Sequence, residues 1–362
     1  MKIMLFLFLS ILSYLTTSAQ KWTNYTMANT SKKLCNDCVN AIAVDLDGSL
    51  WFGTSNGVSK FDGKRWISYT VSDGLAGNAI FAISIDARDN KWFGTDEGGI
   101  SRFDGVNWTN YINNVGLVFD RVTVLTIDQK NNKWFGTSNG VLKLYNKEWT
   151  AYNDGNGLIC NTITSIATDT KGNIWIGAGK AVSKFDGNHW TTYTTAFGLA
   201  GPVLSISIDQ QGNIWFGTTG GVTKLEDTDL GSSCKTYNEA QATTTDMQYN
   251  IGLKNTTSNS GRDLNDSYYS DIKKFNGVKW TSYYSTSDGL VDNIVHCIAI
   301  DKQGNKWFGT SNGISKFDGI KWVTYTTSDG LVNNDINVIA IDSQGNKWIG
   351  THGGVSKLED GL

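Results

Sequence analysis

The sequence predicts an all-β fold, a seven-bladed β-propeller with four-stranded blades, and two repeated tryptophan motifs carry that prediction. A tetrapeptide Trp-Phe/Ile-Gly-Thr/Ala recurs seven times, and a Trp-x-x-Tyr motif recurs seven times as well; together they account for all 14 tryptophans. A fixed period of about 41 residues is typical of proteins in which each repeat forms one structural unit. The first motif begins at Trp51, Trp92, Trp134, Trp175, Trp215, Trp307 and Trp348, and the second at Trp22, Trp66, Trp108, Trp149, Trp190, Trp280 and Trp322.

Each repeat contains four short strand-like segments separated by turn residues, which we call strands a, b, c and d. In the last copy, residues 336–341 alternate as strand a, residues 347–351 form strand b, and residues 355–358 form strand c. In earlier copies the Trp-x-x-Tyr motif supplies strand d. Gly345 provides the positive φ of the a–b hairpin, and the Asp that begins this turn is expected to bind turn amides. Four strands at this spacing make one propeller blade.

The phase of the two ends predicts how the ring closes. The chain begins with a lone strand d, Trp22–Tyr25, and the seventh copy ends after its strand c at residues 355–358. The orphan strand and the missing strand are complementary, so we expect the N-terminal strand to pair onto the last blade. That pairing would remove two free sheet edges.

The two faces of strand a differ in size, which fits wedge-shaped packing near the ring axis. One and three positions before the turn Asp the residues are mostly Ile, whereas two positions before it they are always small. A bulky face can pack on the next blade only if the facing side chains are short. The tryptophans are interpreted as filler between blades. The small residues are Ala43, Ser84, Thr126, Ala167, Ser207, Ala299 and Ala340.

Residues 1–19 predict a cleaved signal peptide. Lys2 precedes an apolar run over residues 3–15, and Thr17-Ser18-Ala19 supplies the small residues of a cleavage site. Residues 20–362 would then form the propeller, in a secreted or periplasmic protein. No later segment approaches 18 consecutive apolar residues, so we expect no membrane insertion of the mature chain.

Charge and motif content argue against several classes of protein. The formal net charge is -3, with acidic and basic residues evenly scattered, so no basic face exists to bind nucleic acid. The sequence has no phosphate loop, dinucleotide fingerprint or nucleophile elbow, and we expect no cofactor. Cys35-x-x-Cys38 lies in a d–a loop, where a local disulfide is compatible with an oxidising compartment. A zinc site would need a second cysteine pair.

One interval in the repeat is 92 residues long, because about 50 residues are inserted between Trp215 and Trp307. The inserted residues 228–270 are rich in Ser, Thr, Asn and Asp and lack strand periodicity. Segments 221–227 and 271–277 both have the pattern of strand c, so the sequence leaves open which one pairs in blade 5. The insertion is either a lid or docking arm, or a tolerated surface excursion.

The repeat resembles a known family. The pattern Gly-Leu-x-x-Asn-x-Ile-x-x-Ile-x-x-Asp-x-x-Gly-Asn-x-Trp-Phe-Gly-Thr-x-x-Gly-Val-x-Lys-Phe-Asp, nearly complete in residues 289–318 and 330–358, is similar to the two-component regulator propeller repeat. That family forms the extracytoplasmic sensor region of bacterial hybrid histidine kinases. The resemblance implies a non-catalytic propeller that binds a ligand or a protein. Without a kinase in this sequence, it would signal through a membrane sensor protein in trans.

Divergent residues in otherwise uniform loops are the best candidates for a ligand site. The d–a loops and b–c turns share one rim, where ligands of propellers usually meet the central channel. Polar and aromatic side chains there suit a small polar molecule or a saccharide. The candidates are Asn40, Phe81, His296 and Asn337 at the start of strand a, and Asp96, Glu97, Lys180 and His352 in the b–c turns.

His296 and His352 belong to adjacent blades and are expected to face one another near the channel. Two histidines do not make a metal site, which needs three or four ligands. They do keep open an alternative function, because streptogramin lyases are propellers with a loosely similar repeat. A lyase would need a base, an acid and a metal at one site, so a separation beyond about 10 Å between these histidines and a carboxylate would exclude it. A second alternative is a scaffold that docks partners through residues 228–270.

Overall fold

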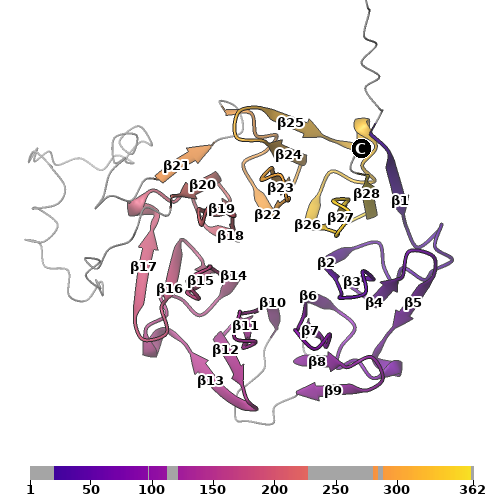
Figure 1. Ribbon diagram of the computed structural model, residues 1–362, viewed down its shortest axis with the longest axis horizontal. Helices are drawn as coiled ribbons and strands as arrows, with labels where there is room; N and C mark the ends of the chain where they lie inside the picture. Colours follow the sequence, from indigo (N-terminus) through magenta and orange to yellow (C-terminus); the bar gives the residue numbers. More distant parts are fainter. Residues whose placement is uncertain (1–19, 97, 112–120, 227–279, 284–287, 360–362) are drawn as a thin grey trace, which may run out of the picture.

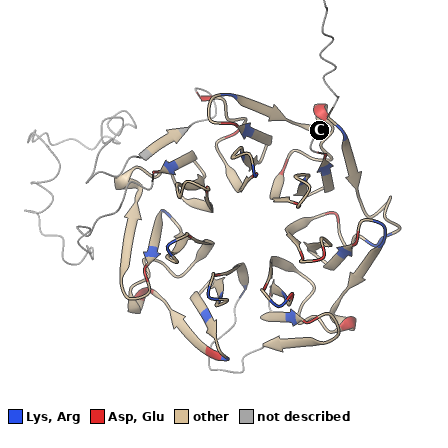
Figure 2. Ribbon diagram, in the orientation of Figure 1, with Lys and Arg blue, Asp and Glu red and all other residues tan. Residues whose placement is uncertain are grey.

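A computed structural model describes residues 20–96, 98–111, 121–226, 280–283 and 288–359 of the chain. The described residues form seven four-stranded antiparallel sheets, arranged around a central axis as the blades of a propeller (Figure 1). The predicted fold class is therefore confirmed. Acidic and basic residues of both signs are spread over the whole ring (Figure 2).

The strands follow one another as a, b, c and d in each blade. Blade 1 contains β2 (Val39–Val44), β3 (Leu50–Thr54), β4 (Gly57–Phe61) and β5 (Trp66–Tyr69); blade 2 contains β6 (Ile80–Ile85), β7 (Lys91–Thr95), β8 (Ile100–Phe103) and β9 (Trp108–Tyr111); blade 3 contains β10 (Val122–Ile127), β11 (Lys133–Thr137), β12 (Gly140–Tyr145) and β13 (Glu148–Tyr152); blade 4 contains β14 (Ile163–Thr168), β15 (Ile174–Ala178), β16 (Ala181–Phe185) and β17 (Trp190–Thr194).

The remaining blades repeat the order, and four d–a loops contain a 3-10 turn within the residues that the structure describes. Blade 5 contains β18 (Val203–Ile208), β19 (Ile214–Thr218), β20 (Gly221–Leu225) and β21 (Trp280–Tyr283); blade 6 contains β22 (Val295–Ile300), β23 (Lys306–Thr310), β24 (Gly313–Phe317) and β25 (Trp322–Tyr325); blade 7 contains β26 (Ile336–Ile341), β27 (Lys347–Thr351), β28 (Gly354–Leu358) and β1 (Trp22–Tyr25). The 3-10 turns are η1 (Val71–Asp73), η2 (Asp154–Asn156), η3 (Thr195–Phe197) and η6 (Thr327–Asp329).

The ring closes as the sequence predicts. Strand β1 pairs antiparallel with β28, with Trp22 opposite Leu358 and Tyr25 opposite Val355, and the two strands lie side by side in Figure 1. Trp22 also packs on the preceding blade. A Cβ added to Gly330, whose φ is +121°, would lie 2.7 Å from the Trp22 ring. Glycine at this position therefore lets the d–a loop of blade 6 lie directly against the closing strand.

The core consists of apolar layers between neighbouring blades. Trp51 of blade 1, for example, is 1% exposed and packs in one cluster with Ile80, Phe93 and Phe103 of blade 2. The small residues of strand a face the next blade, as expected: Ser84 Oγ donates to the carbonyl of Leu125 at 3.1 Å. The prediction that strand b tryptophans fill the space between blades is confirmed.

Each strand b tryptophan is anchored by the Asp that begins its a–b turn, six residues earlier. The indole Nε1 donates to Oδ2 of that Asp in every blade, over 2.7 Å at Asp45 and 3.1 Å at Asp86. The same Asp accepts turn amides, as predicted, but the bond to the indole was not foreseen. The pairs are Asp45–Trp51, Asp86–Trp92, Asp128–Trp134, Asp169–Trp175, Asp209–Trp215, Asp301–Trp307 and Asp342–Trp348.

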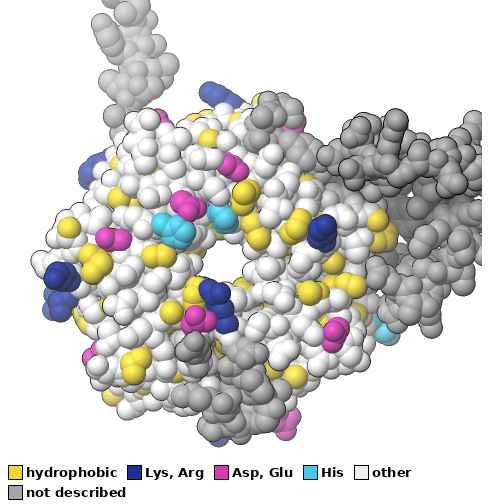
Figure 3. Space-filling model, turned by 180° about the vertical axis from the view of Figure 1, so that it is seen from behind, with side chains coloured by type: hydrophobic (Ala, Val, Ile, Leu, Met, Phe, Trp, Pro, Cys, Tyr) yellow, Lys and Arg dark blue, Asp and Glu magenta, His cyan; other side chains and the backbone are white. Residues whose placement is uncertain are grey.

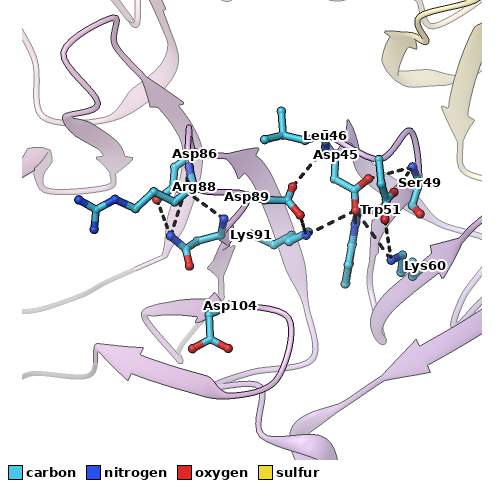
Figure 4. A network of polar contacts seen from close by, with 12 residues as sticks. Asp45, Leu46, Ser49, Trp51, Lys60, Asp86, Arg88, Asp89, Lys91 and Asp104 are labelled. Carbon is cyan, nitrogen blue, oxygen red and sulfur yellow. Dashed lines mark hydrogen bonds and ion pairs between the residues drawn. The ribbon is translucent and has the colours of Figure 1, made fainter.

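A lysine of the next blade joins this anchor between blades 1 and 2 (Figure 4). Lys91 Nζ lies 3.5 Å from Asp45 Oδ2 and 5.5 Å from the centre of the Trp51 ring. The side chains of Lys91 and Asp45 are 5% and 0% exposed. Lys91 Nζ also lies 2.6 Å from Asp89 Oδ2 of its own blade, so this buried lysine joins one carboxylate of each blade.

The two anchoring carboxyls of blades 1 and 2 differ in their pKa. Burial alone would raise the pKa of Asp86, but hydrogen bonds from Asn90 and Trp92 outweigh it, and the pKa is lowered. Burial raises the pKa of Asp45, and a hydrogen bond with the neighbouring carboxyl of Asp47 raises it further. Blade 1 has Ser49 where blade 2 has Asn90, so Asp45 lacks the side-chain amide that helps to hold Asp86 ionised.

Blade 5 resolves the question that the sequence left open about its strand c. Gly221–Leu225 pairs with Trp280–Tyr283 as strands c and d of that blade. The predicted insertion 228–270 and the competing segment 271–277 lie outside the described residues. The chain therefore leaves β20 and enters β21 on the rim of the c–d turns, which is opposite to the rim of the b–c turns.

We expect Trp22→Ala to weaken ring closure. Loss of this half-buried indole should lower the free energy of unfolding by about 2 to 3 kcal/mol, somewhat below the cost of a fully buried tryptophan. Hydrogen exchange should accelerate in β28, its pairing partner. Trp108→Ala is the matched control, because Trp108 packs on Gly74 as Trp22 packs on Gly330. Equal exchange in β28 of the two variants would contradict closure through β1.

We expect Asp86→Asn and Asp45→Asn to respond oppositely to pH. The lowered pKa of Asp86 means that its stabilisation is present above the ordinary value of 3.8 and is lost as the pH falls through the folded-state pKa. Asp86→Asn should therefore lower the free energy of unfolding by about 2 kcal/mol at pH 7 and by less in acid. The raised pKa of Asp45 means that its contribution falls as the pH rises from 3.8 through the folded-state pKa. The loss of unfolding free energy caused by Asp45→Asn should therefore become smaller toward neutral pH.

Urea denaturation between pH 3 and 7, followed by tryptophan fluorescence, measures both trends. Parallel pH profiles for the two variants would show that the environments of Asp45 and Asp86 do not differ as described.

Candidate functional site

In each blade the second residue of strand a occupies a β-bulge. The register between strands a and b shifts around the second residue of strand a, for example between Val39 and Ala41. A bulge leaves one residue unpaired and redirects its side chain, which is why bulges are frequent beside functional sites. The bulged residues are Asn40, Phe81, Thr123, Thr164, Leu204, His296 and Asn337.

Four bulged side chains hold neighbouring blades together. Each one donates a hydrogen bond to the carbonyl of the first residue of strand a in the next blade, a contact that we call a clip. The clips are Asn40 Nδ2 to Ile80 at 3.0 Å, Thr123 Oγ1 to Ile163 at 2.8 Å, Thr164 Oγ1 to Val203 at 2.6 Å and Asn337 Nδ2 to Val39 at 3.1 Å.

The other three bulged residues do not make this contact. Phe81 and Leu204 have no polar side-chain atom, and His296 directs Nε2 at Ser311 Oγ, 2.9 Å away. The junctions between blades 2 and 3, 5 and 6, and 6 and 7 are therefore unclipped. All three of these side chains are half-buried, so each retains surface that can meet a ligand.

A His–Asp–His cluster lies at the junction of blades 6 and 7. His352 Nδ1 donates to Asp335 Oδ2 at 2.7 Å, and His296 Nε2 lies 3.8 Å from Asp335 Oδ1. The side chains of His296, Asp335 and His352 are 33%, 39% and 51% exposed. The two histidines thus meet through one carboxylate, as their expected proximity implied.

The arrangement of this cluster limits its chemistry. Ser311, His296 and Asp335 are not a nucleophilic triad, because both Ser311 and Asp335 approach the same ring nitrogen of His296. His352 differs, since Asp335 binds its Nδ1 and thereby orients the ring. An imidazole held in this way can exchange a proton or a hydrogen bond with a ligand through Nε2.

The junction of blades 2 and 3 carries different side chains at the equivalent positions. The guanidinium of Arg121 stacks on Phe81, with Cζ 3.8 Å from the ring centre. Arg121 Nε lies 3.6 Å from Asp96 Oδ1, and the two side chains are 48% and 46% exposed. At the junction of blades 5 and 6 the corresponding residues, Leu204 and Ile294, are apolar, and Ile294 is 39% exposed.

These groups lie around one opening. Figure 3 shows two histidines beside acidic side chains at the edge of the central opening, and a basic side chain beside an acidic one elsewhere on its edge. The third histidine, His189, belongs to a c–d turn on the other rim, where its Nδ1 lies 3.5 Å from Asp186. We call the rim of the b–c turns and d–a loops, around this opening, the mouth.

The structure gives the predicted residues different roles. Phe81, Asp96, His296 and His352 belong to the unclipped junctions, whereas Asn40 and Asn337 use their amide donors in clips. Lys180 is exposed in the b–c turn of blade 4. Glu97 lies outside the described residues.

The local disulfide between Cys35 and Cys38 stays a prediction for an oxidising compartment, and the structure shows the two thiols separately. Both cysteines are free. Cys35 Sγ donates to the carbonyl of Val58 at 3.3 Å, and Cys38 Sγ donates to Asn40 Oδ1 at 3.4 Å, so each thiol has its own acceptor. Burial raises the pKa of the Cys297 thiol, beside His296, to about 12, which makes it a poor nucleophile at neutral pH.

Sequence reasoning missed Asp335, Arg121 and Ser311. Asp335 and Arg121 occupy the position just before strand a, outside the strand a starts and the b–c turns from which the predicted site residues were taken. The signal was present, because these are the only charged residues at that position. The other blades have Cys38, Ala79, Thr162, Pro202 and Ile294 there.

Three other features of the described part of the chain bear on metal binding, membrane insertion and surface hollows. No group of three or more His, Cys, Asp or Glu side chains within it could hold a metal ion. No helix in the same residues is both long and apolar enough to cross a membrane. A shallow hollow of about 510 Å³ lies on the loop before β2, lined by Met27, Ala28, Ser31, Lys32 and Asp37, and it contains none of the predicted ligand-site residues.

Comparison with known families identifies three of the repeats. Residues 157–180, 198–220 and 289–312 match the two-component regulator propeller family. No curated protein shows significant similarity to the chain.

Solved structures share the fold at low sequence identity. The extracellular domain of a candidate hybrid two-component system from B. thetaiotaomicron, BT3049, is 21% identical, with a TM-score of 0.72. The match covers 94% of this chain but 41% of that domain, so this chain spans about two fifths of its length. Virginiamycin B lyase from Staphylococcus aureus, studied as a catalytically inactive His-to-Ala variant with quinupristin, is 13% identical, with a TM-score of 0.65 and coverage of 94% and 99%. PorZ, a surface component of the type-IX secretion system of Porphyromonas gingivalis, is 16% identical, with a TM-score of 0.63 and coverage of 90% and 46%.

We expect the clips to contribute measurably to stability. Thr164→Val removes the hydroxyl but keeps the shape, and should lower the free energy of unfolding by about 1 kcal/mol. Conversely, Leu204→Thr should install a clip to Val295 and raise stability by a comparable amount. Leu204→Val is the matched control, because valine has the same branching without the hydroxyl. If Leu204→Thr and Leu204→Val have equal urea midpoints, a hydroxyl at the bulge does not clip the blades.

Proposed function

Because this chain carries repeats of the two-component regulator propeller family, we propose that it is an extracytoplasmic sensor-type propeller that binds a small polar molecule or saccharide at the mouth. The observation that carries the proposal is the His296–Asp335–His352 cluster at an unclipped junction. His296 lacks the clip that four other bulged residues make, and all three side chains present hydrogen-bonding groups at the central opening. A site of convergent polar groups beside apolar ones is the usual form of a small-molecule site.

The mouth offers both polar and apolar contacts. Asp335 and the two histidines provide donors and acceptors, and Leu204 and Ile294 provide apolar surface at the next junction. Phe81 adds an aromatic side chain. This combination suits a ligand with hydroxyl groups and an apolar face, such as a sugar ring.

The proposed location and signalling route rest on the predicted signal peptide and on the relatives. A leader at residues 1–19 would direct the protein to the periplasm or the medium. A propeller there would signal through a membrane sensor protein in trans. The extracellular location of the similar domain from B. thetaiotaomicron fits this placement.

A second candidate function is that of a lyase acting on a small molecule. It is favoured by one observation, the orientation of His352 by Asp335, since an imidazole fixed in this way is suited to proton transfer. Both histidines also lie within 3.8 Å of one carboxylate, well inside the separation that would exclude this function. The scaffold alternative depends on residues 228–270, outside the described part of the chain.

Thermal-shift measurements with a panel of neutral and acidic oligosaccharides test the binding proposal. A ligand at one hundred times its dissociation constant should stabilise the fold by about 2.7 kcal/mol. His352→Ala should reduce the shift, whereas the control His189→Ala, on the other rim, should leave it unchanged. A shift that persists in His352→Ala and Asp335→Ala would move the site away from the mouth.

Incubation with quinupristin, followed by mass spectrometry, tests the lyase candidate. Conversion by the native chain that is lost in His352→Ala and kept in His189→Ala would favour the lyase over the non-catalytic sensor. An unchanged quinupristin signal with native protein removes this substrate from consideration.

A further inference from the structure

We infer that Phe81 and Arg121 form a subsite for an oxyanion, so that the ligand of the mouth carries a carboxylate, sulfate or phosphate group. This inference rests on the proposed function, because it specifies the ligand class that the mouth would bind. It depends on the contacts of one guanidinium at an unclipped junction.

The stacking of Arg121 leaves its hydrogen-bond donors available. Arg121 Cζ lies over the Phe81 ring, 3.8 Å from its centre. The guanidinium carries five N–H donors in one rigid plane, and contact of Cζ with the ring does not use them as hydrogen-bond donors. The contact from Nε to Asp96, at 3.6 Å, is longer than a hydrogen bond. A guanidinium fixed over an aromatic ring is pre-organised to bind an oxyanion through two parallel hydrogen bonds.

The ring does not need a charge at this position. Five of the other blades have Cys38, Ala79, Thr162, Pro202 or Ile294 just before strand a, and those blades close in the same geometry. The charged exceptions, Arg121 and Asp335, both adjoin an unclipped junction. Arg121 is also 48% exposed, so its packing on Phe81 accounts for only part of its surface.

Asp96 is a weak competitor for the same guanidinium. Both side chains are about half exposed, and ion pairs of this kind contribute roughly 0 to 1 kcal/mol to stability. A ligand oxyanion that makes two direct hydrogen bonds can therefore replace this carboxylate. Removal of Asp96 should strengthen binding of an acidic ligand.

Saturation-transfer difference NMR with four probes tests the subsite. Glucuronate, glucose 6-sulfate and glucose 6-phosphate share a sugar ring with neutral glucose and distinguish the three oxyanions. At constant ionic strength, at least one acidic probe should bind the native protein about tenfold more tightly than glucose. Arg121→Gln should reduce that preference to within about twofold, and Asp96→Asn should increase it.

Arg65→Gln is the matched control. Arg65 pairs with Asp62 on the other rim and is 84% exposed, so its replacement changes the net charge equally without touching the mouth. The preference should survive in this variant. Thermal unfolding of Arg121→Gln should match that of the native chain, which separates a lost contact from a damaged fold.

The outcomes separate this inference from the proposed function. Equal binding of glucose and the acidic probes, a preference retained in Arg121→Gln, or weaker acidic binding in Asp96→Asn would overturn the subsite. If none of the four probes binds, a neutral oligosaccharide that stabilises the protein at the mouth would overturn the subsite and keep the proposed function. A complete absence of binding across both experiments would contradict both.

Discussion

In every blade the innermost strand carries one extra residue, and the side chain of that bulged residue leaves the sheet toward the neighbouring blade. Four of these side chains, Asn40, Thr123, Thr164 and Asn337, hydrogen-bond a carbonyl across the junction. The geometry of the bulge is the same where the clip is missing. The ring therefore offers seven equivalent positions, each of which can hold blades together or contact a ligand.

The ring tolerates unclipped junctions because other contacts hold the blades. Each strand b tryptophan is buried against the next blade, and its indole is fixed by an Asp of its own a–b turn. In blades 1 and 2 a buried lysine connects that Asp to the neighbouring blade. These contacts lie in the core and at the far rim. Replacing a bulged residue at the mouth therefore lowers stability by about one hydrogen bond and leaves the fold intact.

Much of the fold could be predicted from the sequence, because its determinants repeat. The paired tryptophan motifs predicted the number of blades, and the orphan strand Trp22–Tyr25 predicted how the ring closes. The indole–Asp bond also had a signal, an Asp six residues before each strand b tryptophan. The site was less predictable, because one sequence cannot separate a polar residue that clips blades from one that faces a ligand. Asn40 and His296 occupy the same position, and only their contacts distinguish them.

A crystal structure of the chain with a bound ligand tests the central claim most directly, namely that the mouth binds ligand where blades are unclipped. The account predicts ligand atoms within contact distance of His296, His352 and Asp335, with the clips of Asn40, Thr123, Thr164 and Asn337 intact. A ligand seated on the clipped junctions, on the far rim or on the outer loop before β2 would contradict it.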